Sequence, residues 1–166
     1  MRDLGLPEHR AKQIRAEVIA EHVRNARIRG VVCFTCGNAA DALTLTGIDV
    51  IEVGERGKIT PRRWWPAAEI ARCWPLHFDA TSGHLPVSMM LEVGKRLYSE
   101  LGKLDMNAVY KVPSGSGETL VCLKLAYPEI KFAAVYDNKH PHTAYNSNAP
   151  LNRLVELLAE TVIIRS

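Results

Sequence analysis

The sequence predicts an α/β fold, a three-layer Rossmann-like arrangement with a mostly parallel sheet and helices on both faces. Short apolar runs rich in β-branched residues alternate with longer segments whose apolar residues recur at helical period, as in chains that form parallel sheets. The 166 residues, 47% of them hydrophobic and 23% charged, are enough to bury one core. We therefore expect residues 1–166 to form a single α/β domain.

The expected elements follow from the apolar period and from the glycines and prolines at the boundaries. Residues 8–29 carry an apolar stripe at helical period between Pro7 and Gly30, which are typical of the beginning and the end of a helix. The other expected helices are residues 39–46, 67–72, 86–101, 120–127 and 151–164. The expected strands are residues 31–34, 48–53, 76–78, 109–113 and 130–136. The polar segments 54–66 and 137–150 are expected to be loops.

A turn rich in glycine and serine joins the strand 109–113 to the helix that follows it. Its small or hydroxyl-bearing residues are Ser114, Gly115, Ser116, Gly117 and Thr119. Such a turn gathers backbone N–H groups at a helix N-terminus, where the partial positive charge favours an anion. The pattern predicts a phosphate or carboxylate cradle, although an ordinary turn capped by serine or threonine has the same composition. Glu118 would repel an anion unless its carboxylate points away.

The carboxyl ends of parallel strands meet at one edge of a sheet, and ligands of α/β proteins bind there. The turn 35–38, Thr-Cys-Gly-Asn, follows the strand 31–34 directly, just as the turn 114–119 follows the strand 109–113. We therefore expect the turns 35–38 and 114–119 to lie at the same edge of one sheet.

Charge and cysteine content narrow the classes of partner. The net charge of +3 does not favour a nucleic-acid-binding protein. No apolar run in the sequence reaches the length of a membrane-spanning helix. Residues 1–25 carry charges throughout and lack the apolar core of a signal peptide, so we expect a cytoplasmic protein with reduced thiols. Cys33 and Cys36 are spaced as in redox sites or half of a zinc site. No second pair completes a metal site, and none is predicted.

Three stretches of the sequence follow one another in an order found in a known enzyme family. Residues 109–135 run through an apolar strand, a glycine-rich turn with a threonine, an apolar helix, Pro128 and a second strand. Residues 30–43 form a strand, a Thr-x-Gly-Asn turn and an alanine-rich helix. Lys12 lies upstream, with Arg15 soon after it. Together these stretches resemble the fold-type II pyridoxal-phosphate enzymes, the class of the tryptophan synthase β-subunit and cysteine synthase.

The resemblance implies a lyase- or synthase-like enzyme that acts on an amino acid with pyridoxal phosphate, which serves as the electron sink. It implies that Lys12 is the catalytic residue, holding the cofactor covalently through its amine, and that Asn38 hydrogen-bonds the ring hydroxyl of the cofactor. The residues that would hold the cofactor phosphate are Ser114, Gly115, Ser116, Gly117 and Thr119. The residues that would meet the substrate carboxylate are Thr35, Cys36 and Gly37.

Two other interpretations stay open. The turn 114–119 is equally suited to another small phosphate-containing ligand, such as a nucleotide, a sugar phosphate or a phosphoribosyl substrate. The chain is alternatively a catalytically inactive binding or assembly protein, in which Trp64 and Trp65 would form a contact surface, and a homo-oligomer is compatible with this. Lys95 and Lys124 are alternatives to Lys12 as the reactive lysine.

Overall fold

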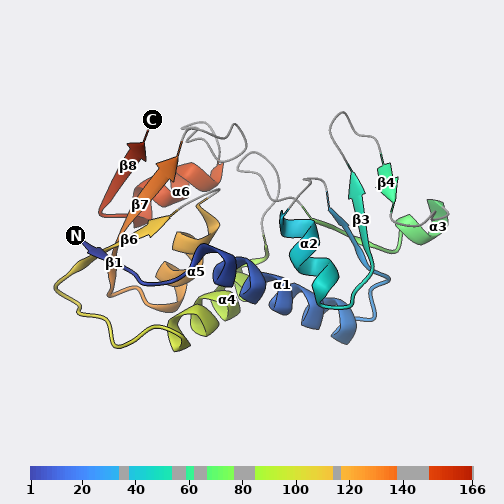
Figure 1. The fold of residues 1–166 in the computed structure, drawn as a ribbon, viewed down its shortest axis with the longest axis horizontal. Coiled ribbons are helices and arrows are strands. Elements are labelled where there is room, and N and C mark those ends of the chain that lie inside the picture. Colours follow the sequence, from blue (N-terminus) through green and yellow to red (C-terminus); the bar gives the residue numbers. More distant parts are fainter. Residues whose placement is uncertain are drawn as a thin grey trace. The chain divides into compact units, whose positions relative to one another are not determined.

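The computed structural model of the protein describes residues 1–33, 38–53, 59–61, 67–76, 85–113, 117–137 and 150–165. Its contacts group the chain into two compact units, residues 1–11 with 79–166 and residues 12–78. Each unit contains a four-stranded sheet with helices (Figure 1). The predicted α/β class, with mostly parallel strands flanked by helices, is confirmed. A single domain over residues 1–166 stays a prediction, and each unit is described by itself.

The first unit is built on a parallel sheet with the strand order β1-β6-β7-β8. The strands are β1 (Arg2–Asp3), β6 (Val109–Pro113), β7 (Lys131–Asp137) and β8 (Thr161–Arg165). Ala134 of β7 lies opposite Val112 on one side and Val162 on the other. Residues 132–136 are all buried, and because successive side chains point to opposite faces, both faces of β7 are covered.

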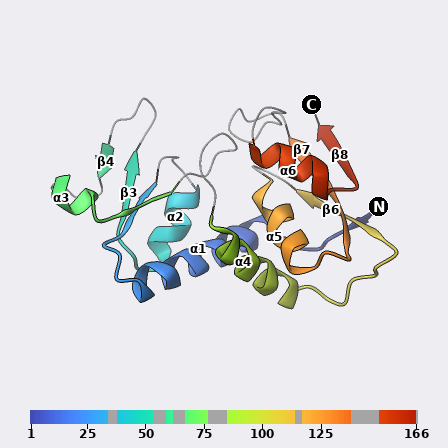
Figure 2. The same cartoon turned by 180° about the vertical axis from the view of Figure 1, so that it is seen from behind.

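The described helices that lie wholly in this unit are α4 (Val87–Ser99), α5 (Glu118–Ala126) and α6 (Pro150–Leu158). Helix α5 connects β6 to β7 and α6 connects β7 to β8, and both lie on the same face of the sheet (Figure 2). Helix α4 packs on α5, and its buried side includes Met90, Val93 and Leu97. The segment 114–117 joins β6 to α5, and α5 packs against α4 and α6.

Gly94 lets helices α4 and α5 approach to backbone contact. A Cβ atom at position 94 would lie 2.0 Å from the carbonyl oxygen of Cys122 and 3.0 Å from the Cβ of Ala126. No side chain fits between the two helices there, so the packing of α4 against α5 requires glycine at position 94, although glycine has a low helix propensity.

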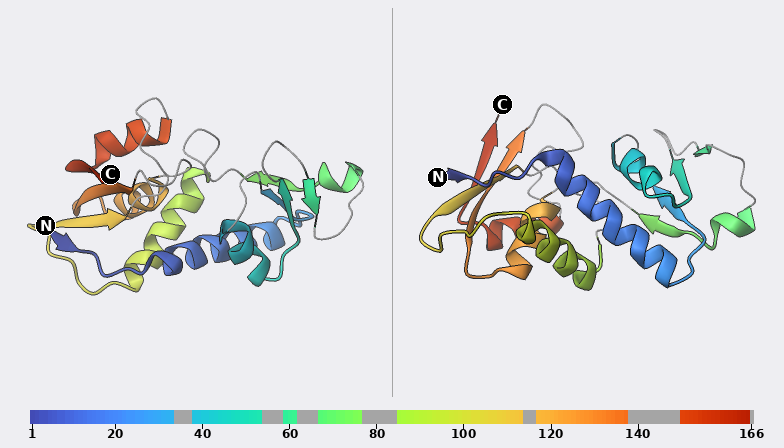
Figure 3. Two further views of the ribbon diagram at one scale, coloured as in Figure 1. Left: turned by 45° about the horizontal axis from the view of Figure 1, so that its top comes forward. Right: turned by 60° about the horizontal axis from the view of Figure 1, so that its bottom comes forward.

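The second unit has the strand order β4-β3-β2-β5, in which β3 and β4 are antiparallel and β2 runs parallel to β3 and β5 (Figure 3). The strands are β2 (Val31–Cys33), β3 (Val50–Val53), β4 (Ile59–Pro61) and β5 (Trp74–Leu76). The helices are α1 (Glu8–Asn25), which begins in the first unit, α2 (Asn38–Leu45) and α3 (Ala67–Ile70). Val32, Ile51 and Cys73 form a buried cluster, and Ile70 packs against it.

Two local expectations are wrong. The expected helix 151–164 is helical only to Leu158, and Thr161–Arg165 is strand β8, because its β-branched run pairs with β7. The expected loop 54–66 contains strand β4, which pairs with β3.

Among the described helices, none combines the length and the apolar character that crossing a membrane requires.

A third expectation, that the turns 35–38 and 114–119 share an edge of one sheet, is also wrong. Strand β2, before the first turn, pairs with β3 and β5, whereas strand β6, before the second turn, pairs with β1 and β7. The two strands thus belong to different sheets, and sheet geometry alone does not bring the two turns together.

We predict that Gly94→Ala lowers the free energy of unfolding by roughly 3 kcal/mol, because the added Cβ overlaps a backbone oxygen that cannot rotate away. Gly102→Ala is the matched control, since nothing lies within 4 Å of a Cβ at that position. Denaturant titration of both variants measures the difference. Equal stability of the two variants would contradict the close approach of α4 and α5.

Candidate functional site

The described part of the glycine-rich turn is Gly117 together with the first turn of helix α5. Gly117 is the N-cap residue and has a φ of +92°, a backbone region in which other residues are strained. It has no side chain with which to cap the helix. The first backbone bond runs from the N–H of Val121 to the carbonyl oxygen of Gly117 at 3.2 Å. The N–H groups of Thr119 and Leu120 have no hydrogen-bond partner within the described residues.

These N–H groups suit an anion. At the start of a helix the first amides point along the axis without an intrahelical acceptor, and the helix dipole adds partial positive charge. Oxygen atoms of a phosphate or a carboxylate satisfy such donors. Thr119 is half-buried beside them. Ser114, Gly115 and Ser116 lie outside the described residues, so their part in the cradle stays a prediction.

Behind Gly117, a strand and a helix close on the backbone. A Cβ at this position would lie 2.6 Å from Cγ2 of Val155 on α6 and 2.8 Å from the hydroxyl oxygen of Tyr136 on β7. Asn152 Oδ1, also on α6, would lie 3.7 Å away. The start of α5 is thus held in place by the two elements that follow it in the chain.

A buried hydrogen bond supports that contact. The hydroxyl of Tyr136 donates to Oδ1 of Asn152 at 2.7 Å, and both side chains are fully buried. Burial, and then the charge of Glu156, raises the pKa of the Tyr136 hydroxyl well above its usual value, so the donor keeps its proton. Neither residue stands out in the sequence, because a tyrosine near a strand end and an asparagine in a helix belong to no motif.

Glu118, the first residue of α5, is only 5% exposed and has a polar interaction within the protein. Its carboxylate is therefore held in the interior of the first unit instead of extending into solvent. A buried acid beside the proposed cradle opposes an anion by charge, while the N–H groups of Thr119 and Leu120, which have no acceptor among the described residues, favour one.

The other predicted site residues belong to the second unit. Lys12 lies in helix α1, is half-buried and has a polar interaction within the protein. Asn38 begins helix α2, which follows strand β2, so the strand–turn–helix order is as expected. Residues 35–37, the predicted substrate-binding turn, lie outside the described residues, as do Trp64 and Trp65. The structure places Gly117 at the N-cap of α5 and Thr119 in its first turn, and leaves the grouping of Lys12 and Asn38 with them a prediction.

The two alternative lysines differ in their surroundings. The amine of Lys124 donates to the carbonyl oxygen of Ile130 at 2.7 Å, which ties it to the connection between α5 and β7. Lys95 is exposed on α4. A reactive amine has to be available to its partner, and the structural bond of Lys124 argues against that role.

A solved structure of another protein has a fold similar to that of this chain. No protein-family model and no curated protein matches this sequence. Among solved structures, the crystal structure of O-ureido-L-serine synthase resembles the chain with a TM-score of 0.51 at 14% sequence identity. The match covers 93% of this chain and 63% of that chain, so this chain spans less than two thirds of the synthase. The likeness shows a shared fold.

We predict that Gly117→Ala lowers the free energy of unfolding by roughly 2–5 kcal/mol, the sum of left-handed backbone strain and overlap with Val155 and Tyr136. Gly5→Ala is the control, because Gly5 also has a positive φ, +78°, but nothing within 4 Å of its Cβ. It should cost only roughly 1–2 kcal/mol. Thermal and denaturant unfolding compare the two. The same loss in both variants would show that packing against β7 and α6 contributes nothing.

We predict that Tyr136→Phe costs about 1–2 kcal/mol at neutral pH, because a buried hydrogen bond is lost. The raised pKa in the folded state means that the unfolded state releases this proton first as the pH rises above 10. Tyr136 therefore makes the protein less stable with rising pH in that range. The free energy of unfolding of Tyr136→Phe should fall less steeply above pH 10, and identical slopes in both proteins would refute the assignment.

Proposed function

We propose that this chain is a pyridoxal-phosphate-dependent, lyase- or synthase-like protein that acts on an amino acid. The observation that carries the proposal is the likeness to O-ureido-L-serine synthase over 93% of the chain. That synthase is a pyridoxal-phosphate enzyme of the type that the sequence resembles. The likeness of fold and the order of the sequence motifs both support this proposal.

The residues of the first unit fit a bound phosphate. In the proposal, the N–H groups of Thr119 and Leu120 and the turn 114–117 bind the cofactor phosphate. The buried bond between Tyr136 and Asn152 keeps the start of α5 fixed, so these donors need no rearrangement when the phosphate arrives. Bound there, pyridoxal phosphate would supply an electron sink for chemistry at the α-carbon of an amino acid.

The second unit would supply the remaining contacts. Lys12 would hold the cofactor covalently, Asn38 would hydrogen-bond its ring hydroxyl, and residues 35–37 would bind the substrate carboxylate. Helix α2 begins directly after the turn 35–37, so a carboxylate bound by that turn would meet the positive end of the helix dipole. These roles come from the sequence resemblance, and the order β2, turn, α2 supports them.

The test is the absorption spectrum of the purified protein with added pyridoxal phosphate, before and after borohydride reduction. We expect a band that differs from that of the free cofactor and is lost in Lys12→Ala, because only an amine held at the site forms the covalent bond. Lys95→Ala is the control, an exposed lysine in the first unit whose loss should leave the band unchanged.

Two outcomes would contradict the proposal. If no new band forms in the wild type, pyridoxal phosphate is not the ligand, and a thermal-shift panel of nucleotides and sugar phosphates then tests the turn 114–119 for another phosphate. If the band forms but survives in Lys12→Ala and disappears in another lysine variant, the cofactor is confirmed and the assignment of Lys12 is wrong.

A further inference from the structure

An open pocket of about 390 Å³ lies in the second unit, where helix α1 ends and the chain turns toward β2. Its volume is within the range of small-molecule sites. Its charged lining consists of Arg24, Arg27, Arg29, Arg72 and Asp49. With four arginines and one aspartate, the pocket lining carries a net charge of about +3, as much as the whole chain.

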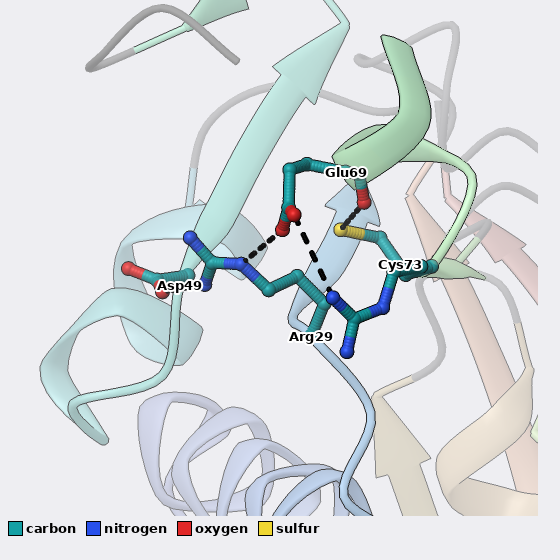
Figure 4. Close-up of polar contacts among 5 residues, drawn as sticks. Arg29, Asp49, Glu69 and Cys73 are labelled. Atoms are coloured by element: carbon teal, nitrogen blue, oxygen red, sulfur yellow. Dashed lines mark hydrogen bonds and ion pairs between the residues drawn. The ribbon is translucent and has the colours of Figure 1, made fainter. Parts of the chain in front are cut away.

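Two carboxylates hold one of these arginines in place (Figure 4). Arg29 Nε donates to Oε2 of Glu69 at 2.7 Å, and its Nη1 forms an ion pair with Asp49. Glu69 also contacts Arg72, with 3.5 Å between Oε1 and Nη1. Four guanidinium groups against these two carboxylates leave an excess of two positive charges at the pocket.

Arg24 is fixed by a different contact. Its Nη2 donates to the carbonyl oxygen of Thr46, just after the end of helix α2 at Leu45. A cation is stabilised there by the negative end of the helix dipole, and the bond fixes the direction of the side chain. Two of the four arginines are thus positioned before any ligand arrives, which lowers the entropy that binding would cost.

Arg27 occupies a position that favours glycine. Helix α1 ends in a Schellman motif, in which the N–H of Ile28 donates to the carbonyl oxygen of Val23 at 2.9 Å and that of Arg27 to Arg24 at 3.2 Å. The residue at this position has a left-handed backbone, and Arg27 has a φ of +54°. An arginine there is strained where a glycine would not be.

Within the described residues, the guanidinium group of Arg27 is not held by the protein in the way that those of Arg24 and Arg29 are. Arg27 is exposed, and no hydrogen bond or ion pair joins its guanidinium to another described residue. Arg27 thus costs backbone energy without a hydrogen bond or ion pair to another described residue that offsets this cost, and it lines a pocket with three other arginines.

We propose that this pocket binds the phosphate group of a small phosphate monoester. A phosphate dianion matches the excess of two positive charges, and guanidinium groups present paired N–H donors that fit phosphate oxygens. Asp49 and Glu69 do not block it, because both are engaged by Arg29. The carbonyl groups of Val23 and Arg24 near the end of α1 are satisfied by the Schellman motif. All the residues that line this pocket belong to the second unit, whereas the turn 114–119 belongs to the first.

The test titrates the full chain with phenyl phosphate and with inorganic phosphate at low ionic strength, using calorimetry. We expect saturable binding that weakens about tenfold or more in Arg27→Gly, the loss of one charge-assisted contact. The melting temperature of Arg27→Gly should be equal to or above that of the wild type, because glycine accepts this φ without strain. Binding and stability therefore change in opposite directions, which a purely structural role would not produce.

Lys103→Gly is the matched control, because it removes one exposed positive charge from the other unit. Its dissociation constant should equal that of the wild type, whereas Arg72→Gln, a second pocket variant, should weaken binding as Arg27→Gly does. Absence of saturable binding, or a dissociation constant that Arg27→Gly leaves unchanged, would overturn the proposal. So would binding of a short DNA duplex that depends on Arg27 when neither phosphate binds, since the site would then be a nucleic-acid surface.

Discussion

The contact between Gly117 and the elements behind it determines where helix α5 begins in the first unit. The backbone of Gly117 lies against Tyr136 of β7 and Val155 of α6, at distances that exclude a Cβ atom. Because α5 begins at this point, the contact fixes where the N–H groups of its first turn lie. The same arrangement that closes the core therefore produces a helix N-terminus without a side-chain cap, and the proposed phosphate site depends on it.

Two positions in the first unit, 94 and 117, have no room for a Cβ atom and therefore require glycine. Gly117 is needed for both its φ and its surroundings, whereas Gly94 is needed because the Cys122 carbonyl of the neighbouring helix leaves no room. Helix α5 is thereby confined at its beginning by β7 and α6 and along its length by α4. A helix confined in this way can present amides to a ligand without moving, which is what a preorganised anion site requires.

In the second unit, ion pairs at the surface connect segments that are far apart in the sequence. Arg29 connects the segment before β2 with Asp49 before β3 and with Glu69 on α3, and these hydrogen bonds raise the pKa of its guanidinium. Cys73 lies beside them, and burial raises the pKa of its thiol, which favours an inert structural cysteine over a redox role. The positive charges of Arg24 and Arg27, which are not part of this network of ion pairs, line the pocket.

The α/β class and the order of most elements follow from the sequence alone, because apolar period and glycine placement are local properties, whereas the anion cradle at the turn 114–119 stays a prediction. The sequence also indicated a family whose fold the solved synthase shares. Tertiary structure decided what is not local. Strand pairing assigned β2 and β6 to different sheets and turned Thr161–Arg165 into a strand. Packing brought Tyr136 and Asn152 behind Gly117, and the meeting of α1 with the residues before β3 gathered the arginines. No window of sequence contains these neighbours, since each depends on contacts between segments far apart in the chain.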